Sequence, residues 1–95
     1  MQKIWGKMSN DQRSAPTPMQ RIRAVLDAVR GSLTDAQIDE VESNVQAGEL
    51  VLALEFLVDF LLDNDATVPA AVNTEILTLL RGYGSNRARE GLPVA

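Results

Sequence analysis

The 95-residue sequence contains neither cysteine nor histidine. Without cysteine, the chain can form neither a disulfide framework nor a thiolate metal site. Without imidazole or thiol, the commonest general bases, nucleophiles and transition-metal ligands are missing, so only carboxylates, hydroxyls and amines remain for chemistry. We therefore predict a protein that is not an enzyme and that holds no metal or other cofactor.

The sequence also lacks a long apolar run. No stretch approaches 18 uninterrupted apolar residues, and Met1 to Asn10 lack the apolar core of a signal peptide. These absences predict a cytoplasmic protein that does not enter a membrane. A chain of this length supports one domain, in which a deep cavity would compete with the core for apolar residues. We therefore expect a surface that binds another macromolecule.

Basic residues are scarce in the middle of the chain. Between Ala24 and Leu80 there are eleven acidic residues and a single base, Arg30, whereas the two flanks together hold eight bases and two acids. The centre is therefore strongly anionic, although the net charge of the whole chain is only −4. Such a field repels nucleic acid and anionic lipid, and it attracts cationic partners by long-range steering.

Two capping boxes mark the first two predicted helices. Thr17 and Thr34 each stand three residues before a glutamine, which is the spacing of this motif. We expect the first helix to end at Gly31, where glycine can adopt the left-handed conformation. The second helix has a thin apolar face and an acidic outer face, and Leu33 before it is placed to pack on Ile38 as a hydrophobic staple.

The third predicted helix, from Glu49 to about Asp63, is apolar around most of its circumference, which is typical of a central helix packed on several sides. A turn comes next, and Pro69 opens a fourth helix that ends at Gly82 or Gly84. The sequence therefore predicts an all-α fold, a compact four-helix domain with a central hydrophobic third helix.

The ends of the chain show no sustained period. Residues 1–16 combine basic residues with glycine, serine and proline, and we expect them to form a flexible N-terminal arm. Trp5 is the one large aromatic side chain in that arm. Residues 85–95 are expected to form a flexible C-terminal tail, which leaves the folded helical domain at residues 17–84.

The acidic side chains of this domain are the candidate partner-binding residues. Glu55, Asp59 and Asp63 recur every four residues on one helical stripe, where like charges destabilise a helix by roughly 0.2–0.5 kcal/mol per pair. A solvated face explains any single carboxylate, but the excess over the whole domain favours a cationic protein partner. The predicted set comprises Asp35, Asp39, Glu42, Glu49, Glu55, Asp59, Asp63 and Asp65.

Other uses of these charges fit less well. The oxygen-rich run Asp63, Asn64 and Asp65, with Asp59 before it, lacks the central glycine and terminal glutamate of a calcium-binding EF-hand. A catalytic carboxylate pair would need a cleft that the sequence does not indicate. The terminal arginines and lysines have only Tyr83 or Trp5 nearby as aromatic partners, so solubility or docking on the acidic centre is favoured over contact with nucleic acid.

One segment, Glu49-Leu50-Val51-Leu52-Ala53-Leu54-Glu55, resembles the helix after the prosthetic-group serine of acyl carrier proteins. In that alignment Asn44 stands at the serine position, Ser43 is one residue early, and the Asp-Ser-Leu motif is missing. The segment Gly31-Ser32-Leu33 offers another serine, but no acidic residue precedes it. An acyl-carrier-like domain is therefore kept as an alternative function, beside a generic acidic helical module for protein interaction.

A second block resembles MafI-type bacterial immunity proteins, which are small helical partners of secreted polymorphic toxins, such as those of contact-dependent inhibition. The block consists of Val41, Val45, Ala47-Gly48-Glu49, Leu52-Ala53-Leu54-Glu55, Leu57, Asp59 and Leu61, and a proline-opened last helix with paired leucines and a closing glycine comes after it. The similarity covers residues 22–84.

This resemblance implies an immunity protein that binds and neutralises a cognate toxin domain in the cytoplasm of the producing cell. Toxins of this kind are often nucleases with basic clefts, against which an acidic partner takes the electrostatic place of nucleic acid. The family has no catalytic residues to transfer. The resemblance therefore implies that the acidic residues named above are the contacts.

Overall fold

The first two helices begin at the predicted capping boxes. The computed structural model describes residues 15–89 and 91–95, in which α2 spans Pro18–Val29 and α3 spans Asp35–Gln46. At the start of α2, the Gln20 backbone N–H donates to Thr17 Oγ1 at 3.1 Å, and the Thr17 N–H donates to Gln20 Oε1 at 2.8 Å. Thr34 and Gln37 form the same pair of bonds before α3. Both boxes satisfy backbone donors that a helix start would otherwise leave unpaired.

Glycine follows both α2 and α3, and the two helix ends differ from each other. After α3, Gly48 adopts a left-handed φ of 79°, and the Glu49 N–H donates to the Asn44 carbonyl at 2.9 Å. After α2, the prediction of a left-handed Gly31 was wrong, because the chain tightens into the 3-10 turn η1, Arg30–Ser32, in which Gly31 keeps an ordinary φ. The turn ends where the Leu33 N–H donates to the Arg30 carbonyl.

Two longer helices complete the domain. Helix α4 spans Leu50–Asp63, α5 spans Ala70–Gly82, and a second 3-10 turn, η2, spans Asn86–Arg89. The described residues form a compact all-α globule of four helices without strands, as predicted. Among the helices of residues 15–89 and 91–95, none is long and apolar enough to cross a bilayer.

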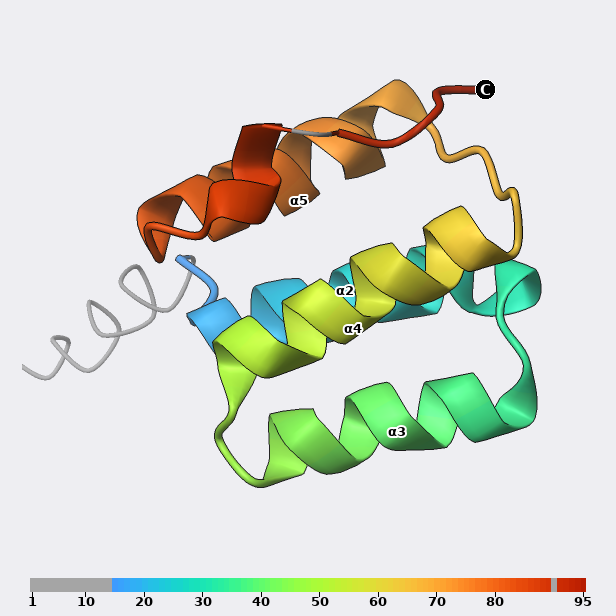
Figure 1. Cartoon of the computed structure of the whole chain (residues 1–95). Helices are drawn as coiled ribbons and strands as arrows, with labels where there is room; N and C mark the ends of the chain where they lie inside the picture. Colours follow the sequence, from blue (N-terminus) through green and yellow to red (C-terminus); the bar gives the residue numbers. More distant parts are fainter. Residues whose placement is uncertain (1–14, 90) are drawn as a thin grey trace, which may run out of the picture.

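Helix α4 lies at the centre of the domain. Figure 1 shows α3 below it, α5 above it and α2 behind it, and α4 contacts all three. Its inward side chains are almost completely buried; they are Ala53, Leu54, Leu57, Val58 and Leu61. They pack with the apolar faces of the other helices, for example with Ile22 of α2 and Leu80 of α5. The prediction of a central hydrophobic third helix is therefore confirmed.

The outward side of α4 is only partly covered. Leu52 and Leu62 are 41% and 37% exposed, and Phe56 and Phe60 stack on each other at the edge of the core with their ring centroids 5.7 Å apart. A domain of this size has too few elements to surround one helix completely. The apolar residues of α4 therefore form a core on one side and a mixed apolar and acidic face on the other.

Residues 85–95 were expected to form a flexible tail, but described residues of this segment pack against the domain in the structure. The Leu92 side chain is 7% exposed and belongs to the core, and its N–H donates to Asn73 Oδ1 at 3.0 Å. A short parallel bridge pairs Val94 with Val68, in which the Val68 N–H donates to the Pro93 carbonyl and the Ala95 N–H donates to the Val68 carbonyl, each at 2.9 Å. This segment uses one buried leucine and isolated backbone bonds, which leave no periodic pattern in a sequence.

The N-terminal end of the described chain is exposed at Ala15 and Pro16. Most of the predicted N-terminal arm, including Trp5, lies outside the described residues. The expectation for residues 1–14 therefore stays a prediction.

Candidate acidic binding surface

Three predicted residues share one face of α3. Asp35, Asp39 and Glu42 succeed each other at intervals of four and three residues, which places their side chains on one stripe of the helix. Asp35 and Asp39 are exposed, and Glu42 is half-buried. Asp35 lies in the first turn of α3, where the positive end of the helix dipole favours a carboxylate.

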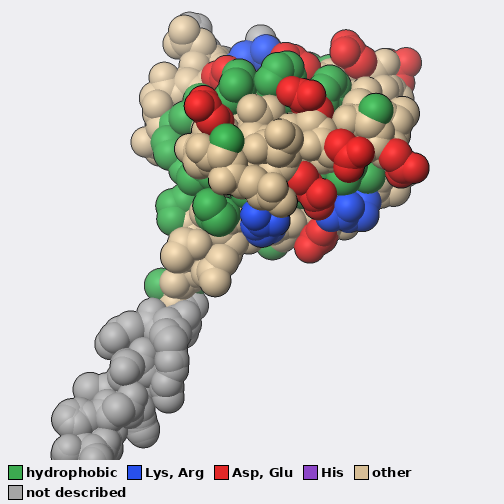
Figure 2. Space-filling view, turned by 90° about the horizontal axis from the view of Figure 1, so that it is seen from below, with side chains coloured by type: hydrophobic (Ala, Val, Ile, Leu, Met, Phe, Trp, Pro, Cys, Tyr) green, Lys and Arg blue, Asp and Glu red, His purple; other side chains and the backbone are tan. Residues whose placement is uncertain are grey.

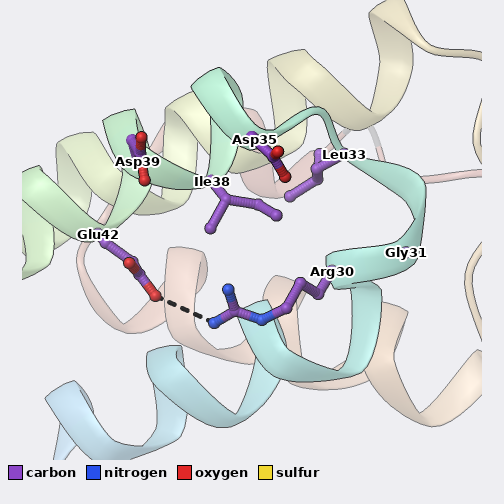
Figure 3. Close-up of a pocket in the computed structure, with 7 residues that line it drawn as sticks. All are labelled: Arg30, Gly31, Leu33, Asp35, Ile38, Asp39 and Glu42. Carbon is purple, nitrogen blue, oxygen red and sulfur yellow. Dashed lines mark hydrogen bonds and ion pairs between the residues drawn. The ribbon is translucent and has the colours of Figure 1, made fainter.

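These three residues border an open groove of about 490 Å³ between α3 and the end of α2 (Figure 3). We call it the η1–α3 groove; its lining consists of Arg30, Gly31, Leu33, Asp35, Ile38, Asp39 and Glu42. Ile38 is only 8% exposed and Leu33 is half-buried, so the groove has an apolar floor. In Figure 3, Ile38 points toward Arg30, while Asp35 and Asp39 project from the same helix beside it.

Arg30 is the only base in the anionic centre, and two carboxylates already hold it. Its Nη2 donates to Asp27 Oδ1 at 2.9 Å and to Glu42 Oε2 at 3.0 Å, and these hydrogen bonds, with Asp27 first, raise the pKa of Arg30 above its ordinary value. Neither Asp35 nor Asp39 takes part in any ion pair of the described part of the chain. As far as the described residues go, the groove therefore keeps unpaired negative charge at its exposed rim.

Two carboxylates of the α4 stripe bind side chains of the same protein. Ser85 Oγ donates to Glu55 Oε2 at 2.8 Å, and Arg87 forms an ion pair with Asp59 through its Nη2 atom. The segment after α5 thus lies on the carboxylates of α4, and these contacts offset the repulsion along the stripe. Asp63, the third residue of the stripe, is exposed.

The remaining predicted residues lie at the two ends of α3. Asn64 Nδ2 donates to the Ser32 carbonyl at 2.9 Å and to Gln37 Oε1 at 2.8 Å, which ties the end of α4 to the start of α3. Asp63 and Asp65 flank Asn64 and are exposed near the Asp35 end, with Asp65 in the left-handed region at a φ of 54°. Glu49 is exposed after the other end of α3.

The structure therefore sorts the predicted set into three places: Asp35, Asp39 and Glu42 in the groove, Asp63 and Asp65 beside its end, and Glu49, Glu55 and Asp59 elsewhere. Figure 2, seen from the α3 side, shows acidic side chains distributed over this face of the molecule. Arg30 and the apolar floor of the groove were not among the predicted contacts. The staple spacing of Leu33 and Ile38 is the signal that points to them.

A further ion pair has a structural position. Arg21 of α2 donates two parallel hydrogen bonds to the carboxylate of Glu75 in α5. Its Nε donates to Oε2 at 2.7 Å and its Nη2 donates to Oε1 at 2.8 Å. The hydrogen bonding from Arg21 lowers the pKa of the Glu75 carboxyl. Because both partners belong to the domain itself, this carboxylate is engaged in holding α2 on α5 and is not offered to a partner.

The structure also places the residues on which the acyl-carrier and metal-binding alternatives depend. Ser43 and Asn44 lie in the last turns of α3, where Asn44 Nδ2 donates to the Glu40 carbonyl at 3.0 Å. Ser32 lies in η1, half-buried, with its carbonyl bound by Asn64. Within residues 15–89 and 91–95, no three carboxylates converge in a way that could hold a metal ion.

Comparison of the chain with protein-family models, with curated proteins and with solved structures found no match. What the groove can bind is therefore inferred from the side chains that line it. The η1–α3 groove offers exposed carboxylates of α3 beside an apolar floor, and it is open to solvent. Such a surface is suited to contact with a cationic partner.

Proposed function

We propose that this protein is an immunity protein that binds and neutralises a cognate bacterial toxin domain through its acidic surface. The observation that carries the proposal is the pair of exposed carboxylates, Asp35 and Asp39, which form no ion pair with any described residue and stand at the rim of an open groove with an apolar floor. The resemblance of residues 22–84 to MafI-type immunity proteins supports the same function. On this proposal the complex forms in the cytoplasm of the producing cell.

Binding proceeds in two steps on this proposal. The anionic centre attracts a basic toxin domain over distances of about one Debye length, roughly 8 Å at physiological salt. Contact then places cationic side chains of the toxin on the carboxylates and its apolar side chains on the groove floor. Because Thr34 and Asn64 hold the start of α3, the backbone that carries Asp35 and Asp39 loses little conformational freedom on binding. The bound domain blocks a surface that the toxin needs, without any chemistry of its own.

The proposal predicts a toxin-encoding reading frame beside the gene for this chain, and it is tested by co-expressing the chain with the product of that reading frame. We expect the two proteins to co-purify as a stoichiometric complex, and the toxin to lose its activity in that complex. The association rate should fall by about tenfold between 0.05 and 0.5 M NaCl, because steering between opposite charges is screened by salt.

The outcome that contradicts the proposal is a toxin that stays active in the presence of excess protein. An uncharged control ligand should show no such salt dependence. A mass increase of the purified chain by one phosphopantetheine group on a serine would instead support the acyl-carrier alternative.

A further inference from the structure

We infer that the η1–α3 groove is the docking site for an arginine-bearing segment of the partner protein, with an apolar side chain next to the arginine. This inference rests on the proposed function, because the partner that it describes is the toxin domain. It adds the place of contact and the side-chain chemistry that the groove selects. Glu55 and Asp59, which the sequence placed in the same binding set, are outside this site because the chain itself occupies them.

The first reason is that the groove already holds a guanidinium group. Arg30 lies along one wall, where Asp27 and Glu42 accept hydrogen bonds from the same Nη2 atom at 2.9 and 3.0 Å. This internal contact occupies Glu42 but leaves Asp35 and Asp39 without an ion pair among the described residues. Their carboxylates stand one helical turn apart and repel each other, so a second cation at the rim relieves that repulsion.

The second reason is the apolar floor. Leu33 and Ile38 lie below the carboxylates, and both face the open space of about 490 Å³. An arginine side chain fits such a surface because its methylene stem packs on apolar groups while its planar guanidinium pairs with a carboxylate. A lysine side chain carries the same charge on a compact ammonium group that is strongly hydrated. Lysine is therefore the poorer ligand beside the apolar floor of the groove.

The third reason is the shape of the site. The groove is open between two elements, so it accommodates a chain segment that crosses the surface, and the apolar floor gives a neighbouring leucine or similar side chain a place to pack. The segment that docks there therefore combines positive charge with an apolar residue. These features are expected at the edge of a basic cleft in the toxin domain.

The test measures binding of a fluorescein-labelled peptide that alternates arginine and leucine to the full chain, by fluorescence anisotropy at 0.15 M NaCl. The variant Asp35→Asn/Asp39→Asn should weaken binding by about fivefold to tenfold, which corresponds to the loss of two exposed ion pairs. The matched control is Glu40→Lys, which changes the net charge by the same two units at an exposed position of α3 outside the groove. It should change the Kd by less than about twofold, because Glu40 does not line the groove and cannot pair directly with a docked arginine.

Three results would overturn the inference. Equal weakening by the groove variant and by the control would show that only the general field matters. Unchanged binding of a peptide with citrulline in place of arginine would show that the guanidinium charge is not recognised. A synthetic peptide of residues 1–14 that binds the groove more tightly than the arginine–leucine peptide would assign the groove to the chain's own basic segment.

Failure of this inference and failure of the proposed function are distinguishable with the same variants. If the toxin domain binds the wild type and the Asp35→Asn/Asp39→Asn variant equally tightly, the groove is not the docking site while the immunity function stands. If the peptide binds through the groove but no toxin is neutralised, the groove is a cation-binding site and the immunity function is refuted. Thermal unfolding of each variant checks that the fold is retained.

Discussion

At the residue scale, the same kind of side chain has different roles in different places. Asp59 and Asp39 are both aspartates in helical stripes, yet Asp59 pairs with Arg87 while Asp39 faces the solvent at the rim of the groove. A carboxylate with a partner inside the molecule contributes to the fold, and one without a partner is available to another protein. The number of acidic residues in the sequence is therefore larger than the number of carboxylates that can bind a partner.

The Arg21–Glu75 pair makes a prediction about pH. Because hydrogen bonding from Arg21 lowers the pKa of Glu75, the stability that this pair contributes is present above the ordinary glutamate pKa of about 4.3 and is lost as the pH falls through the lowered value. We expect Glu75→Gln to lower the urea midpoint by about 0.2–0.5 M at pH 7, and to lower it by clearly less at pH 3.

The matched control for that experiment is Glu40→Gln, which removes an exposed carboxylate that forms no ion pair in the described structure. Its urea midpoint should match that of the wild type at both pH values. A Glu75→Gln effect that is as large at pH 3 as at pH 7 would show that the charge of Glu75 does not stabilise the fold.

At the element scale, local sequence patterns decide where the helices begin. The boxes at Thr17 and Thr34 use side chains only three residues from the backbone groups that they cap, so the motif is complete within one short segment. The glycine stops are weaker signals, since Gly48 becomes left-handed whereas Gly31 continues into a 3-10 turn. A helix end depends more on the elements that pack around it in space.

The cap of α3 gives a prediction at this scale. We expect Thr34→Ala to lower the free energy of unfolding by about 1 kcal/mol, because the Gln37 N–H loses its acceptor. Thr34→Ser keeps the hydroxyl and should cost much less, and urea unfolding of both variants measures the difference. Equal losses for alanine and serine would show that the side-chain bond does not stabilise the helix start.

At the scale of the whole molecule, the segment after α5 closes the domain. Leu92 is buried although it stands in a short, aperiodic stretch, and Val94 in the same stretch is 47% exposed. The segment also brings Ser85 and Arg87 onto α4, so that it takes part in both the core and the distribution of surface charge. The folded unit therefore includes residues beyond the predicted boundary at residue 84.

This role of the C-terminal segment can be tested with a pair of substitutions. We expect Leu92→Ala to lower the free energy of unfolding by about 2 kcal/mol or more, because it removes a core side chain, and Val94→Ala to cost less than about 0.5 kcal/mol. Chemical unfolding of both variants provides the comparison. If the two variants are equally stable, the packing of Leu92 does not contribute to the stability of the fold.

The sequence by itself determined the features that depend on neighbours along the chain. The helix starts at Thr17 and Thr34 and the apolar nature of α4 result from residues at most a few positions apart, because capping and helical periodicity act over one or two turns. The anionic centre is a matter of composition, which the sequence contains directly. For this reason the all-α class and the four helices could be predicted.

Only the tertiary structure decided which carboxylates stay available. Asp59 meets Arg87 from 28 positions away, and Asn64 reaches Gln37 over 27, and nothing in the local pattern specifies such pairs. The groove between η1 and α3 likewise depends on how α2 packs beside α3. The physical reason is that charge pairing and surface shape depend on distances in space, which the folded core sets once the helices have packed.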